Sequence, residues 1–553
     1  MEIDNESFQT STLDHHGLIA ATCKDLGIAR RIDELLNHTD KERVVTPGES
    51  VVAMIINGLG FTNRRLYLVS QFFENKPVER LIAPGLQSSD LTYDTLSHAL
   101  DKISDYGESE LYGRIALDVA LDNKLMGSLY HIDTTSVSVE GQYDEDNQSD
   151  AVNITFGHSK DHRPDLKQFM LSLVVTGDSK FPLWMELLNG NSSDKTNFHS
   201  TISTVRNFQS QLLSNSTERK WVADSALYSK EKLLNDADFQ WLTRVPETVK
   251  EAKILASKDN DSIEWVERKQ GYRTASYESN YGGCKQRWLL VFSEQSHQRE
   301  IKTLEKRIQK QEEKHKSALK KLSGKHFGCT KDALKALAEF KKKKPFFKIQ
   351  ADVVPIEKYC EKGRPKADAK KEIVGYSLET TIERNEQALE DERNKKGRFI
   401  LATNDMDSES YGDELILNDY KSQQKVESGF RFLKDPWFML DSVFLKKPSR
   451  VSALMMVMTL CLMVYNVAEF RLRNALKNNN ETLPNQKRKP ISNPTLRWVF
   501  QLMEGVTIVS FSTGNKNTLA PDKQVVTNLN ETRVRIIRLF GKAACIMYGL
   551  NKL

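Results

Sequence analysis

The sequence predicts an α/β protein: a mixed β-sheet with flanking helices, interrupted by an inserted α+β domain and preceded by an all-α N-terminal domain. Residues 1–125 carry helix signals, and residues 126–246 combine apolar strands with helices. A charged stretch at 247–410 separates this pattern from a helical part at 411–480, and 481–553 form a C-terminal region. Consecutive strands followed by strands separated by helices favour a mixed sheet covered by helices.

Helix start and stop signals define the N-terminal domain. In "TPGESVVAMIINGLGF", Thr46 is placed to cap a helix, Pro47 takes the first helical position and Glu49 completes a capping box. A second helix, in "SDLTYDTLSHALDKISDYG", is expected to begin at Ser89 or Asp90 and to end at the final glycine.

The charge of this domain leaves its role open. Residues 1–115 hold 11 Lys and Arg against 18 Asp and Glu, a net charge of −7. If this domain binds a polyanion such as DNA, it must do so through local patches such as Arg30-Arg31 or Arg64-Arg65. A helical docking or dimerisation domain is an equal alternative.

The sheet is expected in 126–246. "GSLYHIDTTSVSVEG" has the β-branched, alternating pattern of a strand, and "LKQFMLSLVVTGDSKFPLWMELLNGN" reads as two strands joined by a turn. A helical stretch, "DKTNFHSTISTVRNFQSQLL", follows. "KWVADSALYS" and "FQWLTRVP" then add two short strands, with a helix expected between them.

The inserted domain is strongly basic. Residues 298–345 hold 16 Lys and Arg against 6 Asp and Glu, a net charge of +10, whereas the whole chain carries +5. Four apolar residues share a heptad phase and predict a helical hairpin that turns at residues 324–328: Ile301, Leu304, Ile308 and Leu322. A run of four lysines follows, which is either a solvated surface or a contact with the backbone of a nucleic acid: Lys341, Lys342, Lys343 and Lys344.

A single carboxylate among many cations marks the helix predicted in "YKSQQKVESGFRFLKDP". Tyr420, Glu427 and Lys434 are seven residues apart, so on a continuous helix each step shifts them by only about 20°. The helix should end near Asp435, because the residue before a proline avoids the α-helical region. The alternative is a surface helix with ion pairs such as Glu427 to Arg431.

Three acids have positions that point to metal chemistry. Asp133 lies within a strand, where Asp is depleted; Asp224 follows the apolar "WVA" at a strand end; and Glu427 projects from the later helix. Carboxylates are the ligands of Mg²⁺, and two such ions can stabilise the attacking and leaving oxygens of a phosphoryl transfer. Cationic and aromatic groups beside the third acid would hold the phosphates and bases of DNA.

Five ordered motifs carry a family resemblance: "HIDTTSV", "GHSKDHRPDLKQ", "FPLWMELLNGNSSDKTNF", "WVADSALYS" and "YKSQQKVESGFRFLKDP". Together they resemble the bacterial insertion-sequence DDE transposases, and more narrowly the branch marked by Y-x2-R-x3-E-x6-K. Here that signature reads Tyr420, Gln423, Glu427 and Lys434. Gln423 stands at the family's arginine position. Either Gln423 still faces the phosphate, or Lys421 or Arg431 makes that contact instead.

The resemblance implies an RNase H-like core that uses two Mg²⁺ ions, with Mn²⁺ as a substitute, bound by Asp133, Asp224 and Glu427. Such enzymes hydrolyse DNA at the ends of their element, and the freed 3′-hydroxyl attacks target DNA; in this branch the second strand is cut through a hairpin. Four residues are then expected to contact DNA: Tyr420, Gln423, Arg431 and Lys434.

Composition constrains the cellular location and the partners of the protein. The six cysteines form no C-x-x-C pair, and the polar N-terminus does not resemble a signal peptide, so a bacterial cytoplasmic protein, associated with the nucleoid when bound to DNA, is expected. Residues 451–468 lack charges, which reaches the lower limit for a membrane span, but a buried core helix fits better and no membrane partner is expected. The expected partners are the terminal inverted repeats, target DNA and a second copy of the chain on paired ends.

Two rival functions remain at this stage. One is a metal-dependent RNase H-like nuclease that cannot join strands, and the other is a non-catalytic DNA-binding derivative of such an element. Because the three acids and Lys434 are all present, the sequence shows no sign of lost catalysis.

Overall fold

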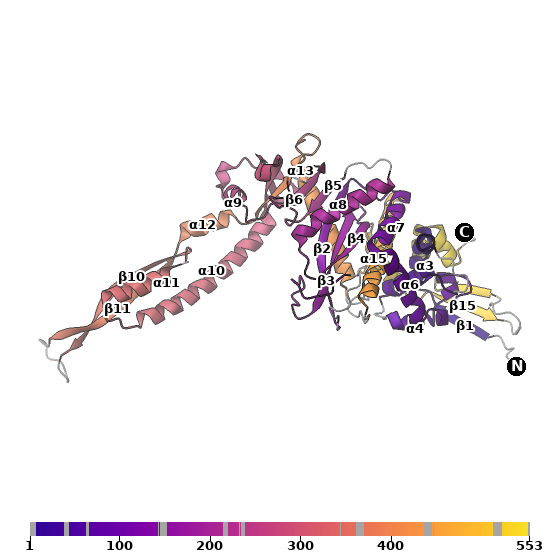
Figure 1. Cartoon of the computed structure of the whole chain (residues 1–553), viewed down its shortest axis with the longest axis horizontal. Coiled ribbons are helices and arrows are strands. Elements are labelled where there is room, and N and C mark those ends of the chain that lie inside the picture. The colour runs from indigo at the N-terminus through magenta and orange to yellow at the C-terminus, as the bar shows by residue number, and fades with distance from the viewer. Residues whose placement is uncertain are drawn as a thin grey trace. The chain divides into compact units, whose positions relative to one another are not determined.

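The computed structural model describes residues 7–37, 44–61, 66–141, 143, 152–177, 179–213, 219–231, 233, 238–342, 344–360, 370–435, 445, 447–512 and 523–550. The chain forms two compact units (Figure 1). The first contains Met1–Thr243 and Leu417–Leu553, and the second contains Arg244–Ile416.

Helices form most of the N-terminal part of the first unit: α1 (His16–Asp25), α2 (Ile28–Leu35), α3 (Pro47–Leu59), α4 (Val69–Phe73), α5 (Val78–Leu81), α6 (Tyr93–Tyr106) and α7 (Glu108–Asp122). The capping box at Thr46 is confirmed, since its side chain accepts from the Glu49 amide and Glu49 accepts from the Thr46 amide. The predicted start of α6 was too early. Thr92 caps that helix, and Ser88–Asp90 form a separate 3₁₀ turn.

The N-terminal part is not entirely helical, which corrects the all-α expectation. Strand β1 (Ser7–Thr12) pairs antiparallel with β15 (Thr507–Ser512), which in turn pairs with β16 (Lys523–Thr527). A short polar strand has little stability without neighbouring strands, and its partner lies about 500 residues away in the sequence, so no local pattern announced it.

The sheet of the first unit has the strand order β4-β3-β2-β5-β6. Its elements are β2 (Leu129–Val139), β3 (Lys167–Thr176), β4 (Pro182–Leu188), α8 (Asp194–Leu212), β5 (Lys220–Ala223) and β6 (Trp241–Arg244). β3 runs antiparallel to β2 and β4, whereas β2, β5 and β6 are parallel. The mixed sheet predicted from the sequence is therefore present. The helix expected between β5 and β6 falls largely on 232 and 234–237, outside the described residues.

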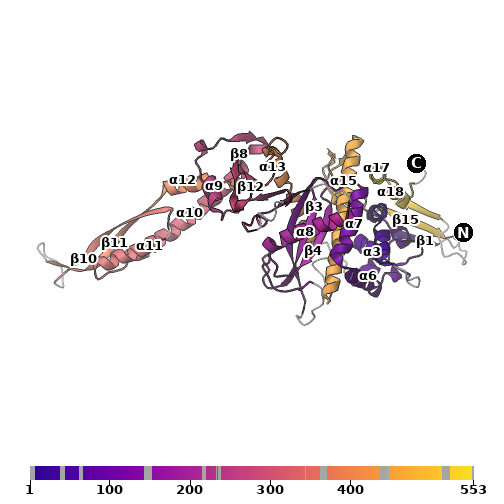
Figure 2. The ribbon, with the colours of Figure 1, turned by 45° about the horizontal axis from the view of Figure 1, so that its top comes forward.

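A long apolar helix, α15 (Pro448–Asn478), forms the core of the first unit beside α7 and β4 (Figure 2). It is long and apolar enough to cross a membrane by length and composition, but 89% of its apolar window is buried inside the protein. The N-terminal helices pack on the same core. The Tyr112 hydroxyl of α7 donates to the Pro182 carbonyl at 2.6 Å, and Arg450 of α15 pairs with Asp101 of α6 at 2.7 Å.

The C-terminal part completes the first unit with β13 (Leu483–Pro484), β14 (Pro490–Ile491), α16 (Leu496–Leu502), α17 (Glu531–Leu539) and α18 (Lys542–Met547). Helix α18 packs on α1, where the Tyr548 hydroxyl donates to the Asp14 carbonyl. The chain's two ends are thus joined by a strand pair and by helix packing.

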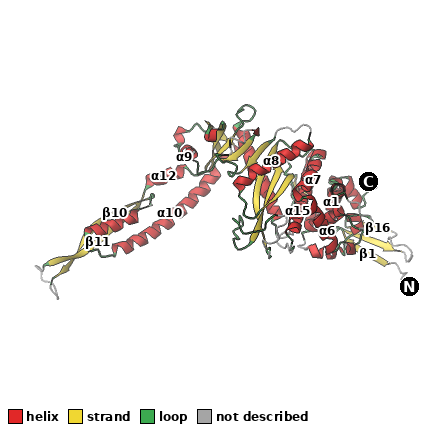
Figure 3. Cartoon of the chain, in the orientation of Figure 1, coloured by secondary structure: helices red, strands yellow, loops and turns green. Residues whose placement is uncertain are grey.

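The second unit combines an antiparallel sheet, in the order β12-β9-β8-β7, with a two-stranded ribbon. The sheet and its neighbours are α9 (Lys250–Ala256), β7 (Val266–Arg268), β8 (Tyr272–Ser279), β9 (Gln286–Ser293), α12 (Glu386–Asn394) and β12 (Arg398–Thr403). The ribbon pairs β10 (Phe347–Tyr359) with β11 (Lys371–Arg384), and helices α10 (Glu294–Ser323) and α11 (Thr330–Lys341) run along it (Figure 3).

The predicted helical hairpin is present as α10 and α11, but its apolar residues do not form a seam between two helices alone. Leu304, Ile308, Leu319 and Leu322 of α10 do turn inward, but they join a cluster with residues of the ribbon such as Phe347 and Leu378. An amphipathic helix can bury its apolar stripe against a sheet as well as against a helix, and the unpredicted strand β11 supplies that surface. The turn after α10 does begin at residue 324, as expected.

Candidate active site

One face of strand β2 carries the first predicted acid. Side chains alternate along a strand, so His131, Asp133 and Thr135 share a face. His131 Nε2 lies 2.8 Å from Ser422 Oγ, immediately before helix α14 (Gln424–Leu433). A β-carbon built on Gly429 of α14 would lie 3.5 Å from Leu173, the residue of β3 directly opposite Asp133. Helix α14 therefore covers the face of the sheet that carries Asp133.

The second acid follows the neighbouring strand. β2 and β5 are parallel, and their last paired residues are His131 and Val222. Continuing that register by two residues sets Asp133 beside Asp224, on strands about 4.8 Å apart. Asp224 Oδ1 accepts from the Ala226 amide at 2.8 Å, and Asp133 Oδ1 from the Thr134 amide at 2.7 Å. The two carboxylates thus lie just beyond the last paired residues of β2 and β5, Asp133 within β2 and Asp224 directly after β5.

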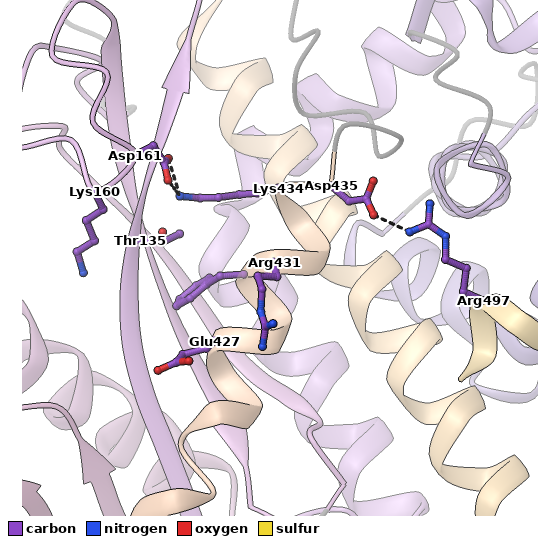
Figure 4. Close-up of a pocket in the computed structure, with 9 residues that line it drawn as sticks. Thr135, Lys160, Asp161, Glu427, Arg431, Lys434, Asp435 and Arg497 are labelled. Carbon is purple, nitrogen blue, oxygen red and sulfur yellow. Dashed lines mark hydrogen bonds and ion pairs between the residues drawn. The ribbon is translucent and has the colours of Figure 1, made fainter. Parts of the chain in front are cut away.

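The third acid faces a cavity over the same strand. Glu427 is exposed on α14 and, with Thr135, lines a cavity of about 780 Å³ (Figure 4). The cavity is otherwise lined by Lys160, Asp161, Phe430, Arg431, Lys434, Asp435 and Arg497. A carboxylate bordered by four cations suits an anionic ligand that reaches Glu427 from solvent.

The acids do not form a closed metal centre. Over the described residues, no three His, Cys, Asp or Glu side chains gather closely enough to hold a metal ion. The predicted two-ion site is therefore not preformed. The available donors are nevertheless all carboxylate oxygens, which fit hard cations such as Mg²⁺ and Mn²⁺.

His131 is a structural group held in one tautomer. The hydroxyl of Ser422 donates its proton to the Asp419 carbonyl at 2.7 Å, so it can only accept from His131, and Nε2 carries the imidazole proton. Burial, reinforced by the charge of Lys425, lowers the pKa of His131 to about 3. The ring is neutral near pH 7 and joins β2 to the start of α14.

Two of the cavity's cations are paired with acids outside the predicted triad. Lys434 Nζ contacts the Asp161 carboxylate at 2.6 and 2.8 Å, and Arg497 Nη1 contacts Asp435 Oδ2 at 2.8 Å (Figure 4). Arg431, by contrast, projects from α14 as an exposed side chain. The predicted end of this helix is confirmed, because α14 stops at Leu433.

Comparison with known families decides the assignment. A model described as "Transposase DDE domain" matches residues 126–464, which contain all three acids. The chain belongs to the transposase DDE family. A second model, "Domain of unknown function (DUF4277)", matches residues 8–117.

The other comparisons add little to this assignment. No curated protein matches the chain. Among solved structures, the chain is similar to one described as "Cryo-EM structure of piggyBac transposase synaptic complex with hairpin DNA". That similarity has 9% sequence identity and a TM-score of 0.37, and covers 88% of this chain and 79% of the other.

The signature helix of this DDE transposase is broken, which corrects the continuous helix expected from the sequence. Tyr420 lies on α13 (Asp413–Lys421), and α14 begins at Gln424. Between them, the Lys425 amide bonds to the Ser422 carbonyl three residues back, and Ser422 bonds through its side chain to the Asp419 carbonyl. Such side-chain bonds compete with helical geometry. Tyr420 and Glu427 therefore lie on two separate helices.

Gln423, at the position of the family's arginine, is only 8% exposed at the junction of α13 and α14. Its contact with DNA stays a prediction. Arg431, one of the two substitutes considered for this contact, does line the cavity. Lys421, the other substitute, is the half-buried last residue of α13.

Sequence reasoning missed three cavity residues. Lys160 and Asp161 belong to the motif "GHSKDHRPDLKQ", in which no single residue carries a signal of its role. Their loop is held to the sheet by Ser136 of β2, whose Oγ accepts from the Lys160 amide at 2.9 Å, and by Gln168 of β3, whose Nε2 donates to the His158 carbonyl at 3.3 Å. No signal pointed to Arg497, which lies in the C-terminal region.

The second unit presents a row of exposed cations on α10. Opposite the buried Leu304 and Ile308, the exposed face carries five cations and one acid: Arg299, Lys302, Lys306, Lys310, Lys320 and Glu313. Among the described residues, no ion pair joins Lys302, Lys306 or Lys310 to an acid, whereas Lys316 on the flank pairs with Glu312 at 2.7 Å. An unpaired cation recurs there about once per helical turn.

The predicted lysine run is less uniform. Lys341 and Lys342 are exposed at the end of α11. Lys344 bends back, donating to the Phe340 carbonyl and lying 4.1 Å from the centre of the Phe340 ring. Lys343 falls outside the described residues. Among the described residues of this run, Lys341 and Lys342 are therefore the exposed cations.

Proposed function

We propose that this DDE transposase cuts DNA at the ends of its insertion sequence and joins the freed 3′-hydroxyl ends to target DNA by two-metal phosphoryl transfer. The observation that carries the proposal is the placement of the three acids. Asp133 and Asp224 follow the register of parallel strands, and Glu427 lies on the helix covering the same face. The order β4-β3-β2-β5-β6 supports the RNase H-like core that the family resemblance implies.

The carboxylates of Asp133, Asp224 and Glu427 would hold Mg²⁺, or Mn²⁺ in place of Mg²⁺. When bound, such ions neutralise charge on the phosphate and activate the attacking oxygen. Glu427 lies on α14, the helix that covers the face of the sheet carrying Asp133. His131 contributes by holding the start of α14 against β2, through the bond to Ser422.

The cations would bind the DNA. Arg431 and Lys434 line the cavity beside Glu427 and supply phosphate contacts next to the cut. The exposed face of α10 presents successive unpaired cations. It is therefore suited to bind the phosphate backbone of the duplex away from the cut. Tyr420 would pack against the sugar or base beside the cut. A homodimer on paired ends, with each copy acting on one end, completes the proposal.

Two assays test this function against its rivals. The protein is incubated with Mg²⁺ and a duplex carrying the end of the element that encodes the chain, and then with a precut end and a target plasmid. Cleavage at the end together with joining of the precut 3′-hydroxyl supports the transposase. Cleavage without joining would support the nuclease, and binding without either reaction would support the non-catalytic derivative.

A further inference from the structure

The active-site cavity has one wall that lies outside the range matched by the transposase family. Arg497 belongs to α16, some thirty residues beyond the end of the match at residue 464, yet it lines the same cavity as Glu427 and Lys434. The C-terminal region therefore contributes a cation to the cavity, although nothing in the family signature requires one.

The Arg497 side chain is held on two sides. Its Nη1 donates to Asp435 Oδ2 at 2.8 Å, and its guanidinium carbon lies 4.9 Å from the centre of the Phe61 ring. The backbone is anchored as well, since the Arg497 amide donates to the Tyr465 hydroxyl at 3.1 Å. A guanidinium fixed in this way loses little conformational entropy when it binds a ligand.

The guanidinium keeps capacity for a second anion. It has five N–H donors, of which one is directed to Asp435, and 44% of the side chain is exposed. The planar arrangement of these donors matches a phosphate with two parallel hydrogen bonds. Its neighbours in the cavity include Arg431 and Lys434, so a phosphate entering there would meet several positive charges.

We propose that Arg497 is a DNA-phosphate-binding residue of the active site, supplied by the C-terminal region, and that Asp435 and Phe61 are positioning residues for its guanidinium. The inference rests on the proposed function, because it assumes that the cavity receives DNA. It adds that the C-terminal region contacts the DNA that is cut. The competing explanation is an ion pair that only anchors α16 to the end of α14.

Variants of Arg497 and of Asp435, the two members of the ion pair, distinguish the two explanations. Binding of a fluorescent duplex carrying the element end is measured over a series of salt concentrations, without divalent metal so that nothing is cut. Arg497→Ala should weaken binding and reduce the log–log salt slope by about 0.9, the value for a single phosphate contact. Asp435→Asn should keep the slope of the parent protein, since it retains the cation. Arg497→Lys should also keep the slope but bind less tightly, because it cannot form the bidentate contact.

Arg535→Ala is the matched control. Arg535 lies in the same region, is 40% exposed and pairs with Glu531 at 3.2 Å, but it does not line the cavity. This variant should bind like the parent. An anchoring role alone predicts that Arg497→Ala and Asp435→Asn lower the midpoint of thermal unfolding equally and leave the slope unchanged, and that result would overturn the inference.

Failure of the inference can be told apart from failure of the proposed function. If the parent protein cleaves with Mg²⁺ and Arg497→Ala keeps the full salt slope, only the role of Arg497 is rejected. If the parent binds the duplex but never cleaves it, the catalytic proposal is rejected, whatever the slope of Arg497→Ala.

Discussion

At the scale of single residues, the sheet gives its acids different environments on its two faces. Asp133 lies on the face covered by α14, whereas Glu186 of β4 lies on the opposite face and accepts from the Thr201 hydroxyl of α8 at 2.7 Å. Burial raises the pKa of Glu186, although the hydrogen bond from Thr201 opposes the shift. The two acids therefore offer a comparison within one sheet.

The acid prediction uses isosteric variants. Asp133→Asn, Asp224→Asn and Glu427→Gln should each lower Mg²⁺-dependent cleavage by more than about 100-fold, because even groups that only orient metal ligands cost about 10–100-fold. Binding of the element end should change little. Glu186→Gln is the control and should cleave normally. A triad variant that cleaves at the parent rate would be removed from the catalytic set.

His131 makes stability depend on pH. Its pKa of about 3 in the folded protein lies below the usual value of 6.5, so the unfolded chain binds more protons between these values and stability is lost as the pH falls through this window. Each such histidine contributes about 1.4 kcal/mol per pH unit. Burial also lowers the pKa of His15, to about 4, so it adds to the same trend.

The test is urea unfolding at several pH values between about 6.5 and 4. His131→Gln cannot titrate, so the fall in unfolding free energy should be shallower by about 1.4 kcal/mol per pH unit. Parallel curves for His131→Gln and the parent would show that His131 titrates normally.

At the scale of elements, α10 shows how packing determines which charged side chains stay exposed and available to a ligand. Its apolar stripe is buried against the ribbon, so the opposite face must be solvated, and its cations have few acids nearby. On the flanks, acids pair with their neighbours, as Glu312 does with Lys316. The helix thus concentrates unpaired positive charge along one line.

A salt titration tests this helix against the lysine run. Replacing Lys302, Lys306 and Lys310 with Gln should weaken duplex binding and reduce the log–log salt slope by about 0.9 for each lysine that binds a phosphate. A second variant replaces Lys341, Lys342, Lys343 and Lys344 in the same way. If the α10 variant keeps the parent slope while the slope of the lysine-run variant falls, the DNA binds the run and not α10.

At the scale of the whole molecule, the N-terminal helices are part of the catalytic unit. Helix α7 packs so closely on β4 that a β-carbon at Gly113 would lie 2.4 Å from the Trp184 ring. Helix α15 is buried between these helices and the sheet. Removing residues 1–125 would therefore expose a large apolar surface.

This packing yields a stability prediction. Gly113→Ala should lower the unfolding free energy by about 1–3 kcal/mol through overpacking, as measured by urea unfolding. Gly328→Ala, where a β-carbon would meet no atom within 4 Å, is the control and should not destabilise the protein.

A chain beginning at residue 126 should aggregate or bind hydrophobic dyes. A soluble, cooperatively unfolding product would show instead that the N-terminal helices are dispensable for folding.

What the sequence by itself determined was local. The capping box at Thr46, the strands around Asp133 and Asp224 and the helical context of Glu427 all follow from spacing and residue type within short windows. Motif order added the family, because five motifs in series are specific where each alone is not. These inferences needed no knowledge of which segments meet.

Only the tertiary structure decided the rest, because it depends on contacts between residues far apart in the chain. His131 and Ser422 are 291 residues apart, yet their hydrogen bond lies where the signature helix breaks. The pairing of β1 with β15, the burial of α10 on β11 and the entry of Arg497 into the cavity are likewise long-range. A local pattern states which face of an element is apolar, but not which partner will cover it, and that partner determines which polar groups remain free to act.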